Sequence, residues 1–296
     1  MNTTQQGQGK GLFYVILSGF LWAVVGTISK FLLNDGSTPV LLILTRNFFG
    51  LCCLTVFLFF YNKKLFHVDR EDIRPMILCC IVMFIYSASY FFCIYFLNVS
   101  LAVMLLYLYP SMVAAASVFL YREKLTLKLT AVLLLTLLGL ALTLNLFTEG
   151  IGELSVPGLI LGFGAAIGAA GYCICVKGLS AKYHAFTINF YGLIVTIIGY
   201  SLLLPFFDLE PLEPMQKITA MIAAFPYLGG FILYSAGVKY LKPSFASIFG
   251  NAEAVFNVIL AALLLGEAFS LSQGFGMVLI IGALVLLEVK RPKQKL

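Results

Sequence analysis

Charged residues are scarce in this chain. Lys, Arg, Asp and Glu make up 11% of its 296 residues, whereas hydrophobic residues make up 61%. A soluble domain carries about 25% charged residues, and no soluble fold of this length could bury so much apolar surface. The scarcity of charge therefore excludes a soluble protein and predicts an integral membrane protein.

The groups that intramembrane enzymes and metal centres use are also missing from the apolar segments. The chain has only two histidines, and neither they nor any aspartate lies in a long apolar run. A nucleophile with its base, a paired-aspartate site and a His-Glu-x-x-His motif are thereby excluded. All seven cysteines lie inside apolar runs without the spacing of a metal site, and their odd number argues against a disulfide framework. We therefore expect neither an enzyme nor a bound metal or cofactor.

Two further absences limit how such a protein can act. The sequence has no Gly-rich phosphate-binding loop, which excludes ATP as a direct energy source. The net charge of +6 is spread over short loops and one tail, whereas a nucleic-acid interface requires a contiguous basic patch. We therefore expect a lipid bilayer, and no nucleic acid, as the partner of this surface.

The sequence does contain a series of apolar segments, each long enough to cross a bilayer. A helix needs about 20 apolar residues to span the hydrocarbon core. Ten segments meet this length, with approximate bounds 12–33, 39–61, 75–97, 100–121, 128–147, 157–179, 185–207, 218–241, 244–265 and 271–289. The sequence thus predicts an all-α membrane protein with ten transmembrane helices.

The distribution of basic residues predicts the orientation of these helices. Lys and Arg collect in the cytoplasmic loops of membrane proteins. With the N-terminus inside, all lysines and arginines except Lys30, Arg46 and Lys217 fall on the cytoplasmic side. Both termini are therefore predicted to be cytoplasmic, in a multi-pass protein of the cell membrane.

One stretch of the chain occurs twice, because Tyr90–Leu127 recurs without a gap as Tyr234–Leu271. A repeat spaced by about half the chain indicates two halves that are built alike. Since each half holds an odd number of spans, the second half must enter the membrane from the opposite side. Residues 1–150 and 151–296 are therefore predicted to form two inverted five-helix repeats. This arrangement places a substrate site near the midplane and permits alternating access.

Several short motifs follow one another in the order found in a known family. They are SGFLWAVVGTISKFLL near the start, Thr45-Arg46-Asn47, LYLYPS in the fourth span, the glutamate-ended helices YREKLT and LLGEAFS, and Gly139 and Gly282 in the closing helices of the two halves. In this order and spacing the chain resembles the ten-helix EamA-type transporters of the drug/metabolite transporter superfamily, over nearly its whole length. It departs from the family pattern at Glu253-Ala254, where the family often has Glu-Pro.

The resemblance implies a secondary transporter in which helices 1–4 rock against helices 6–9, with helices 5 and 10 as a scaffold. Similar proteins export amino acids and other small metabolites, and a few take up nutrients such as choline. We therefore expect proton-coupled export of an amino acid or a related zwitterion or amine, by a monomer or a homodimer. The alternatives are an uptake carrier for a quaternary amine, a multidrug exporter and, less favoured, a channel.

Glu253 is the strongest candidate for a site residue. It lies about ten residues into its helix, roughly 15 Å deep at 1.5 Å per residue, in the middle of a core about 30 Å thick. A carboxylate there is costly and must face protein or water. The helical spacing places Asn257 on the same face and Asn251 beside it, and we expect both in the substrate site. We expect Glu253 to bind substrate or carry a proton, and the alternative is an interhelical hydrogen bond from the neutral acid.

The position aligned with Glu253 in the first repeat is Tyr109, which is followed by Pro110. A proline in the middle of a helix removes a hydrogen bond and opens the backbone. Tyr109 is therefore expected in the substrate site at midplane depth, with Pro110 as a hinge. The alternative is an ordinary, tolerated kink.

Tyrosines gather on the third and eighth helices at helical spacing. Tyr86 and Tyr90 lie one turn apart, and Tyr90 and Tyr234 are repeat partners. With aromatic residues of other helices they can form a cage that attracts cationic or aromatic ligands. The alternative is that these rings only pack between helices or line the membrane interface. The aromatic residues predicted in the substrate site are Trp22, Tyr86, Tyr90, Tyr107, Tyr109 and Tyr234.

Two basic residues, Lys30 and Arg46, lie near the outer ends of their helices. Their long side chains can extend the charge to the membrane surface. We expect both at an outer gate or rim, where Arg46 alternatively attracts a carboxylate. Glu123 and Glu267, repeat partners at opposite membrane faces, are expected to be turn or cap residues.

Overall fold

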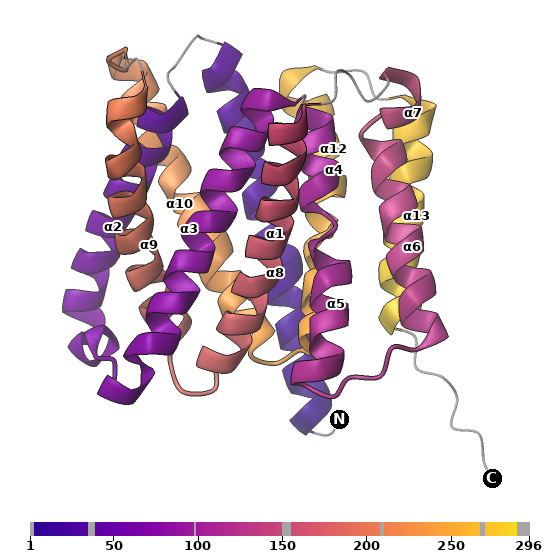
Figure 1. The fold of residues 1–296 in the computed structure, drawn as a ribbon, viewed down its shortest axis with the longest axis horizontal. Helices are drawn as coiled ribbons and strands as arrows, with labels where there is room; N and C mark the ends of the chain where they lie inside the picture. Colours follow the sequence, from indigo (N-terminus) through magenta and orange to yellow (C-terminus); the bar gives the residue numbers. More distant parts are fainter. Residues whose placement is uncertain are drawn as a thin grey trace.

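The computed structural model describes residues 3–34, 39–97, 99–149, 155–207, 210–266 and 270–288, and in these ranges the chain is helical, without strands. Figure 1 shows the long helices packed side by side in one bundle. The predicted repeat boundary between residues 150 and 151 and the predicted cap residue Glu267 lie outside the described residues.

The helices that form the spans are α1 (Thr3–Asn34), α2 (Pro39–Tyr61), α3 (Ile73–Phe96), α4 (Val99–Leu106), α5 (Tyr109–Leu120), α6 (Leu127–Thr143), α8 (Val156–Leu179), α9 (Ala185–Leu203), α10 (Pro214–Val238), α11 (Pro243–Gly250), α12 (Ala252–Leu265) and α13 (Leu271–Glu288). The short elements are η1 (Lys63–Phe66), η2 (Arg70–Asp72), α7 (Leu146–Glu149) and η3 (Leu204–Phe206).

All ten predicted spans are helical. Within the described residues, nine helices or helix pairs are long and apolar enough to cross a membrane, and α6 is a shorter apolar helix of 17 residues. About 17 residues is the lower limit for a membrane span. The prediction of an all-α membrane protein is therefore confirmed. The largest difference in bounds is at α1, which begins at Thr3 because the polar residues before the first span continue its helix.

The two ends of the described chain lie at the same end of the bundle. Nε2 of Gln8 in α1 donates a hydrogen bond of 3.4 Å to Oε2 of Glu288, the last residue of α13. Figure 1 shows α1 beginning and α13 ending on this side. An even number of crossings requires this arrangement.

Two of the spans are each built from two helices. The fourth span is interrupted at Tyr107 and Leu108, and the ninth is interrupted at Asn251, which is the repeat partner of Tyr107. Pro110 accounts for the first interruption, because it lacks the N–H that would continue the helix. The second has no proline, and a tight turn replaces it, in which the Asn251 N–H donates to the carbonyl oxygen of Ile248 at 3.1 Å. Both repeats are therefore bent at the same place.

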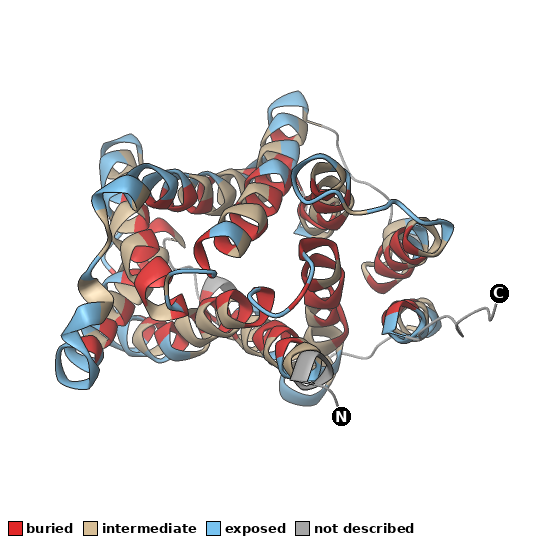
Figure 2. Cartoon of the chain, turned by 90° about the horizontal axis from the view of Figure 1, so that it is seen from below, coloured by how far each residue is buried: buried red, intermediate tan, exposed pale blue. Residues whose placement is uncertain are grey.

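The most extensive helix contacts join α3 to α8, α1 to α10 and α6 to α13. Exchanging the two repeats exchanges the first two pairs and maps the third onto itself, as an approximate twofold axis would require. Helices α6 and α13 form a pair at one side of the bundle (Figure 1). A Cβ at Gly276 of α13 would come within 2.4 Å of the Gly139 carbonyl oxygen of α6, so this pair depends on glycine. Figure 2 shows buried residues on the inner faces of the helices and exposed residues on the outer faces.

Candidate functional site

A small cavity lies where the two broken spans meet α1, α3, α8 and α10. Its volume is about 30 Å³, which is room for one or two water molecules. It is lined by Trp22, Tyr86, Leu106, Tyr107, Tyr109, Ala169, Tyr172, Phe231, Tyr234 and Glu253. The structure thus brings six predicted residues of the site, Trp22, Tyr86, Tyr107, Tyr109, Tyr234 and Glu253, around one space, although they come from five different spans.

Glu253 lies in the first turn of α12, directly after the break at Asn251. The N-terminus of a helix carries partial positive charge, which favours a carboxylate in its first turn. The Glu253 carboxyl group is close enough to the side chains of Tyr107 and Asn257 to interact with both. Helix α1 passes closely on another side, since a Cβ at Gly19 would come within 3.0 Å of the Glu253 backbone nitrogen. The break in the ninth span therefore creates the setting for this carboxyl group.

The indole of Trp22 and two rings of α10 form one wall of the cavity. The Trp22 ring centroid lies 5.1 Å from that of Phe231 and 5.4 Å from that of Tyr234. Such edge-to-face and tilted arrangements are the favourable ones for aromatic pairs. The indole packs directly on α10, because a Cβ at Gly230 would come within 2.6 Å of Trp22 Nε1. A glycine at position 230 is therefore what admits Trp22 to this wall.

Tyr109 connects the two broken spans. Its hydroxyl group donates a hydrogen bond of 2.8 Å to the backbone oxygen of Ser247 in α11. Gly250 gives it room, since a Cβ there would come within 2.6 Å of the Tyr109 hydroxyl oxygen. Pro110 follows in the first turn of α5 and is buried. The first repeat therefore contacts the second at the point where both spans are interrupted.

Three other predicted residues lie beside the cavity and do not line it. Tyr90 packs one turn along α3 from Tyr86. Asn251 is buried in the break, and its Oδ1 makes no hydrogen bond within the described part of the chain. Asn257 lies one turn beyond Glu253, where its Oδ1 would be 2.9 Å from a Cβ at Gly26 of α1.

The predicted gate residue Arg46 packs between α2 and α10. Its guanidinium carbon lies 3.7 Å from the centroid of the Tyr227 ring, which is a cation–π distance. Arg46 Nε is buried and makes no hydrogen bond among the described residues. The second predicted gate residue, Lys30, belongs to α1, and its side chain lies outside the described part of the structure.

A buried polar network behind the cavity was not predicted from the sequence. The Tyr172 hydroxyl of α8 donates to Oδ1 of Asn189 in α9 at 3.1 Å, and it lies 3.1 Å from Oγ of Ser235 in α10. Nδ2 of Asn189 donates to the same Ser235 oxygen at 3.0 Å. The three side chains are buried. The signal that could have found them is Asn189, because an amide inside a span needs a polar partner on another helix.

Replacing Asn189 with leucine is expected to destabilise the protein by about 1–3 kcal/mol, because it leaves buried hydroxyl groups on Tyr172 and Ser235 with fewer partners. Tyr172→Phe removes one hydroxyl group and is expected to cost less, about 1 kcal/mol. The thermal unfolding midpoints of both variants in detergent would test this order. A wild-type midpoint for Asn189→Leu would contradict a stabilising network.

Comparison with known proteins agrees with this architecture. The model of the EamA-like transporter family matches the chain twice, over residues 9–145 and 156–289. An uncharacterized transporter of Archaeoglobus fulgidus is 28% identical over 272 residues, covering 92% of this chain and 94% of that protein. The uncharacterized inner membrane transporter YicL of Salmonella typhimurium is 25% identical over 291 residues, covering 95% of each.

A solved crystal structure has the same fold, with a TM-score of 0.81 over 96% of each chain at 18% identity. Together with the double match of the family model, this likeness extends over both halves of the bundle. The chain therefore belongs to the EamA-like transporter family, within the drug/metabolite transporters, and is a multi-pass membrane transporter.

Proposed function

We propose that the protein is a proton-coupled secondary transporter that exports a small metabolite with an amino group, such as an amino acid, another zwitterion or an amine. The observation that carries this proposal is the composition of the central cavity. Glu253 is the one acidic side chain among the described lining residues, and the other nine are aromatic or aliphatic. The cavity thus offers a single negative charge within an aromatic wall.

This wall favours a positively charged group on the substrate. Aromatic faces attract ammonium groups within about 6 Å of the ring centroid. The attraction between an ammonium group and the Glu253 carboxylate is also stronger in a site from which water is excluded. A substrate with only negative charge would gain neither interaction.

The size of the cavity supports alternating access. A ligand of ordinary size needs a pocket of about 300–1,000 Å³, whereas the enclosed space is about 30 Å³. The helices must therefore separate to admit a metabolite. Both halves supply lining residues, Trp22 and Tyr109 from the first and Tyr172 and Glu253 from the second. We propose that residues 1–150 and 151–296 are the two inverted units that move, with Pro110 as a hinge and Lys30 and Arg46 at the outer gate.

Glu253 is also the residue that we propose for proton coupling. A proton and an ammonium group would compete for the same carboxylate, and such competition is sufficient to couple the two fluxes in opposite directions. We assign the end of the bundle that holds both termini to the cytoplasmic side of the cell membrane, because nearly all lysines and arginines lie at this end. Labelling of an N-terminal tag from outside intact cells would contradict this orientation.

A counterflow experiment tests the transport class. A thermal-shift screen of the purified protein against amino acids, polyamines and choline first selects a stabilising compound. Proteoliposomes loaded with that unlabelled compound should then take up the labelled compound faster than empty ones. A channel would show no such acceleration. An exporter should accumulate the labelled compound inside vesicles in which the cytoplasmic end of the protein faces outward. Failure of every compound to give counterflow would contradict a carrier of this substrate class.

Replacing Tyr234 with alanine is expected to raise the half-saturation concentration of the transported amine about tenfold, because the ring is part of the cavity wall and each cation–π contact contributes about 1–2 kcal/mol when desolvated. Tyr90→Ala should have a smaller effect, since Tyr90 lies beside the cavity. Tyr95→Ala is the control, because Tyr95 is 78% exposed on the outer surface of the same helix as Tyr90. Equal half-saturation concentrations in all three variants would assign Tyr234 to packing alone.

A further inference from the structure

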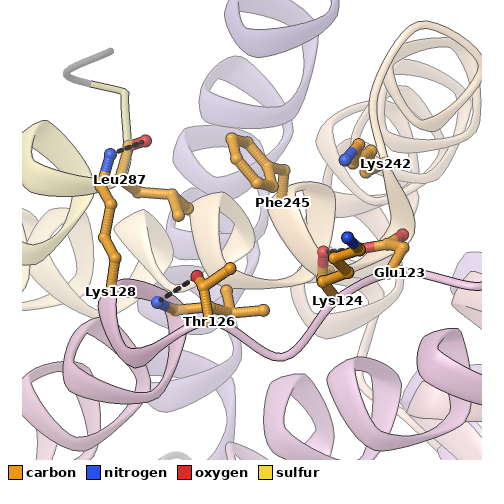
Figure 3. Close-up of a pocket in the computed structure, with 9 residues that line it drawn as sticks. Glu123, Lys124, Thr126, Lys128, Lys242, Phe245 and Leu287 are labelled. Atoms are coloured by element: carbon orange, nitrogen blue, oxygen red, sulfur yellow. Dashed lines mark hydrogen bonds between the residues drawn. The ribbon is translucent and has the colours of Figure 1, made fainter. Parts of the chain in front are cut away.

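A second cavity lies at the end of the bundle where α1 begins and α13 ends. Its volume is about 190 Å³, and Figure 3 shows its side chains. It forms between the segment that joins α5 to α6, the start of α11 and the end of α13. The lining residues are Glu123, Lys124, Thr126, Lys128, Leu129, Lys242, Ser244, Phe245 and Leu287. The first repeat therefore supplies one side of this cavity and the second repeat the other.

Positive charge dominates the lining. Lys124 and Lys242 are exposed, and Lys128 is half-buried and donates to the backbone oxygen of Leu287 at 3.0 Å. Figure 3 shows Lys128 and Leu287 on one side of the cavity and Lys242 and Glu123 on the other. Three lysines against one glutamate leave a net positive site.

The glutamate is already engaged on the protein side. One carboxylate oxygen of Glu123 accepts a hydrogen bond from the Ser244 hydroxyl group, and the other is buried without a hydrogen bond among the described residues. Lys177 lies close enough to interact with it electrostatically. Glu123 therefore joins the connecting segment to α11, and its charge is partly balanced by Lys177, which does not line the cavity.

Two helix N-termini also meet at this cavity. Thr126, which lines it, caps α6 by accepting a hydrogen bond of 3.2 Å from the Leu129 N–H. Ser244 and Phe245, in the first turn of α11, line the facing side. The N-terminus of a helix carries partial positive charge and binds anions, phosphate groups in particular. The backbone therefore adds to the positive potential of the lysines.

We propose that this cavity binds the phosphate group of an anionic phospholipid. Its volume is below the 300–1,000 Å³ of pockets for drug-sized ligands, which suits a headgroup better than a metabolite. Leu125 and Leu127, on either side of Thr126, are 58% and 82% exposed, and this apolar rim would contact the acyl chains. A free phosphate ion shares the headgroup chemistry but would not use the rim. A bound headgroup would connect the two repeats at this end of the bundle.

The test uses the purified full-length protein in a neutral detergent. Its thermal unfolding midpoint is measured with increasing dioleoylphosphatidylglycerol, dioleoylphosphatidylcholine or inorganic phosphate. Phosphatidylglycerol should raise the midpoint in a saturable way, and phosphatidylcholine should not. Lys124→Gln combined with Lys242→Gln should weaken the apparent affinity for phosphatidylglycerol about 30-fold, because each lysine near an anionic lipid contributes about 1 kcal/mol. Both side chains are exposed, so the double variant should fold normally without lipid.

Lys63→Gln combined with Lys64→Gln is the matched control. It removes the same charge from exposed lysines in η1, outside the cavity. An equal loss of affinity in the control, or equal stabilisation by the two lipids, would overturn the proposal. Full stabilisation by inorganic phosphate alone would support an anion site and overturn the lipid as its source.

Discussion

Replacing Glu253 with glutamine is expected to abolish transport driven by a pH gradient. Glutamine has nearly the shape of glutamic acid, so the packing against Gly19 of α1 and the contacts with Tyr107 and Asn257 are preserved in form. The variant can neither release a proton nor attract an ammonium group. Losing a desolvated charge pair costs about 2–5 kcal/mol, which corresponds to a loss of roughly 30-fold or more in the coupled flux.

A second measurement separates the two roles of this carboxyl group. Substrate-for-substrate exchange needs no proton, so a variant that loses only proton coupling keeps counterflow while it loses accumulation under a pH gradient. A variant that also loses the ammonium partner loses both. Glu253→Asp keeps a carboxyl group on a side chain that is one methylene group shorter, so it should retain part of the coupled flux that Glu253→Gln loses. Normal pH-driven flux in Glu253→Gln would exclude Glu253 from both roles, provided that its unfolding midpoint stays near that of the wild type.

The depth of polar residues along the chain could be predicted from the sequence alone. Glu253 and Tyr109 lie at the middle of their spans because the span bounds follow from the lengths of the apolar runs. The approach of the two spans to one cavity follows from the inverted repeat. Trp22 and Tyr86 also reach this cavity, as their placement near the same depth predicts.

The faces that the helices turn inward could not be predicted with the same success. A soluble helix shows its buried face as an apolar stripe, but a membrane helix is apolar all round. For this reason the sequence does not single out Tyr172, which lines the cavity, and does not show that Tyr90 lies beside the cavity wall. The break in the ninth span is also not evident from the sequence, because a tight turn at Asn251, and not a proline, interrupts the helix there. Close helix packing selects these inward faces together with the few buried polar groups, such as Asn189.

Replacing Gly168 with leucine is expected to prevent α8 from packing on α3, and this is the largest expected effect on folding. A Cβ at Gly168 would come within 2.7 Å of the backbone nitrogen of Tyr86 and 2.8 Å of its Cα. Backbone atoms of a packed helix cannot move aside as the end of a flexible side chain can. Overpacking in a well-packed core costs about 1–3 kcal/mol, and a contact with backbone should lie at or above the upper end of this range.

The same close contact between an aromatic residue and a glycine recurs in the other helix pair, with the bulky and small residues exchanged between the repeats. In one helix pair, Tyr86 of α3 packs on Gly168 of α8, and in the other, Trp22 of α1 packs on Gly230 of α10. Gly230 is the repeat partner of Tyr86 in the ungapped alignment. Each pair therefore brings one aromatic ring to the cavity against one glycine. Filling either glycine should disturb the cavity as well as the helix packing.

Gly178→Leu is the matched control for Gly168→Leu, because it makes the same substitution in the same helix at a position where a Cβ would meet nothing within 4 Å. Leucine is also a better helix former than glycine, so the control should fold at least as well as the wild type. The yield of monodisperse protein on size exclusion and the thermal unfolding midpoint should both fall for Gly168→Leu alone. Equal behaviour of the two variants would mean that α3 and α8 do not approach each other as closely as the structure shows, and the shape of the cavity between them would then have to differ as well.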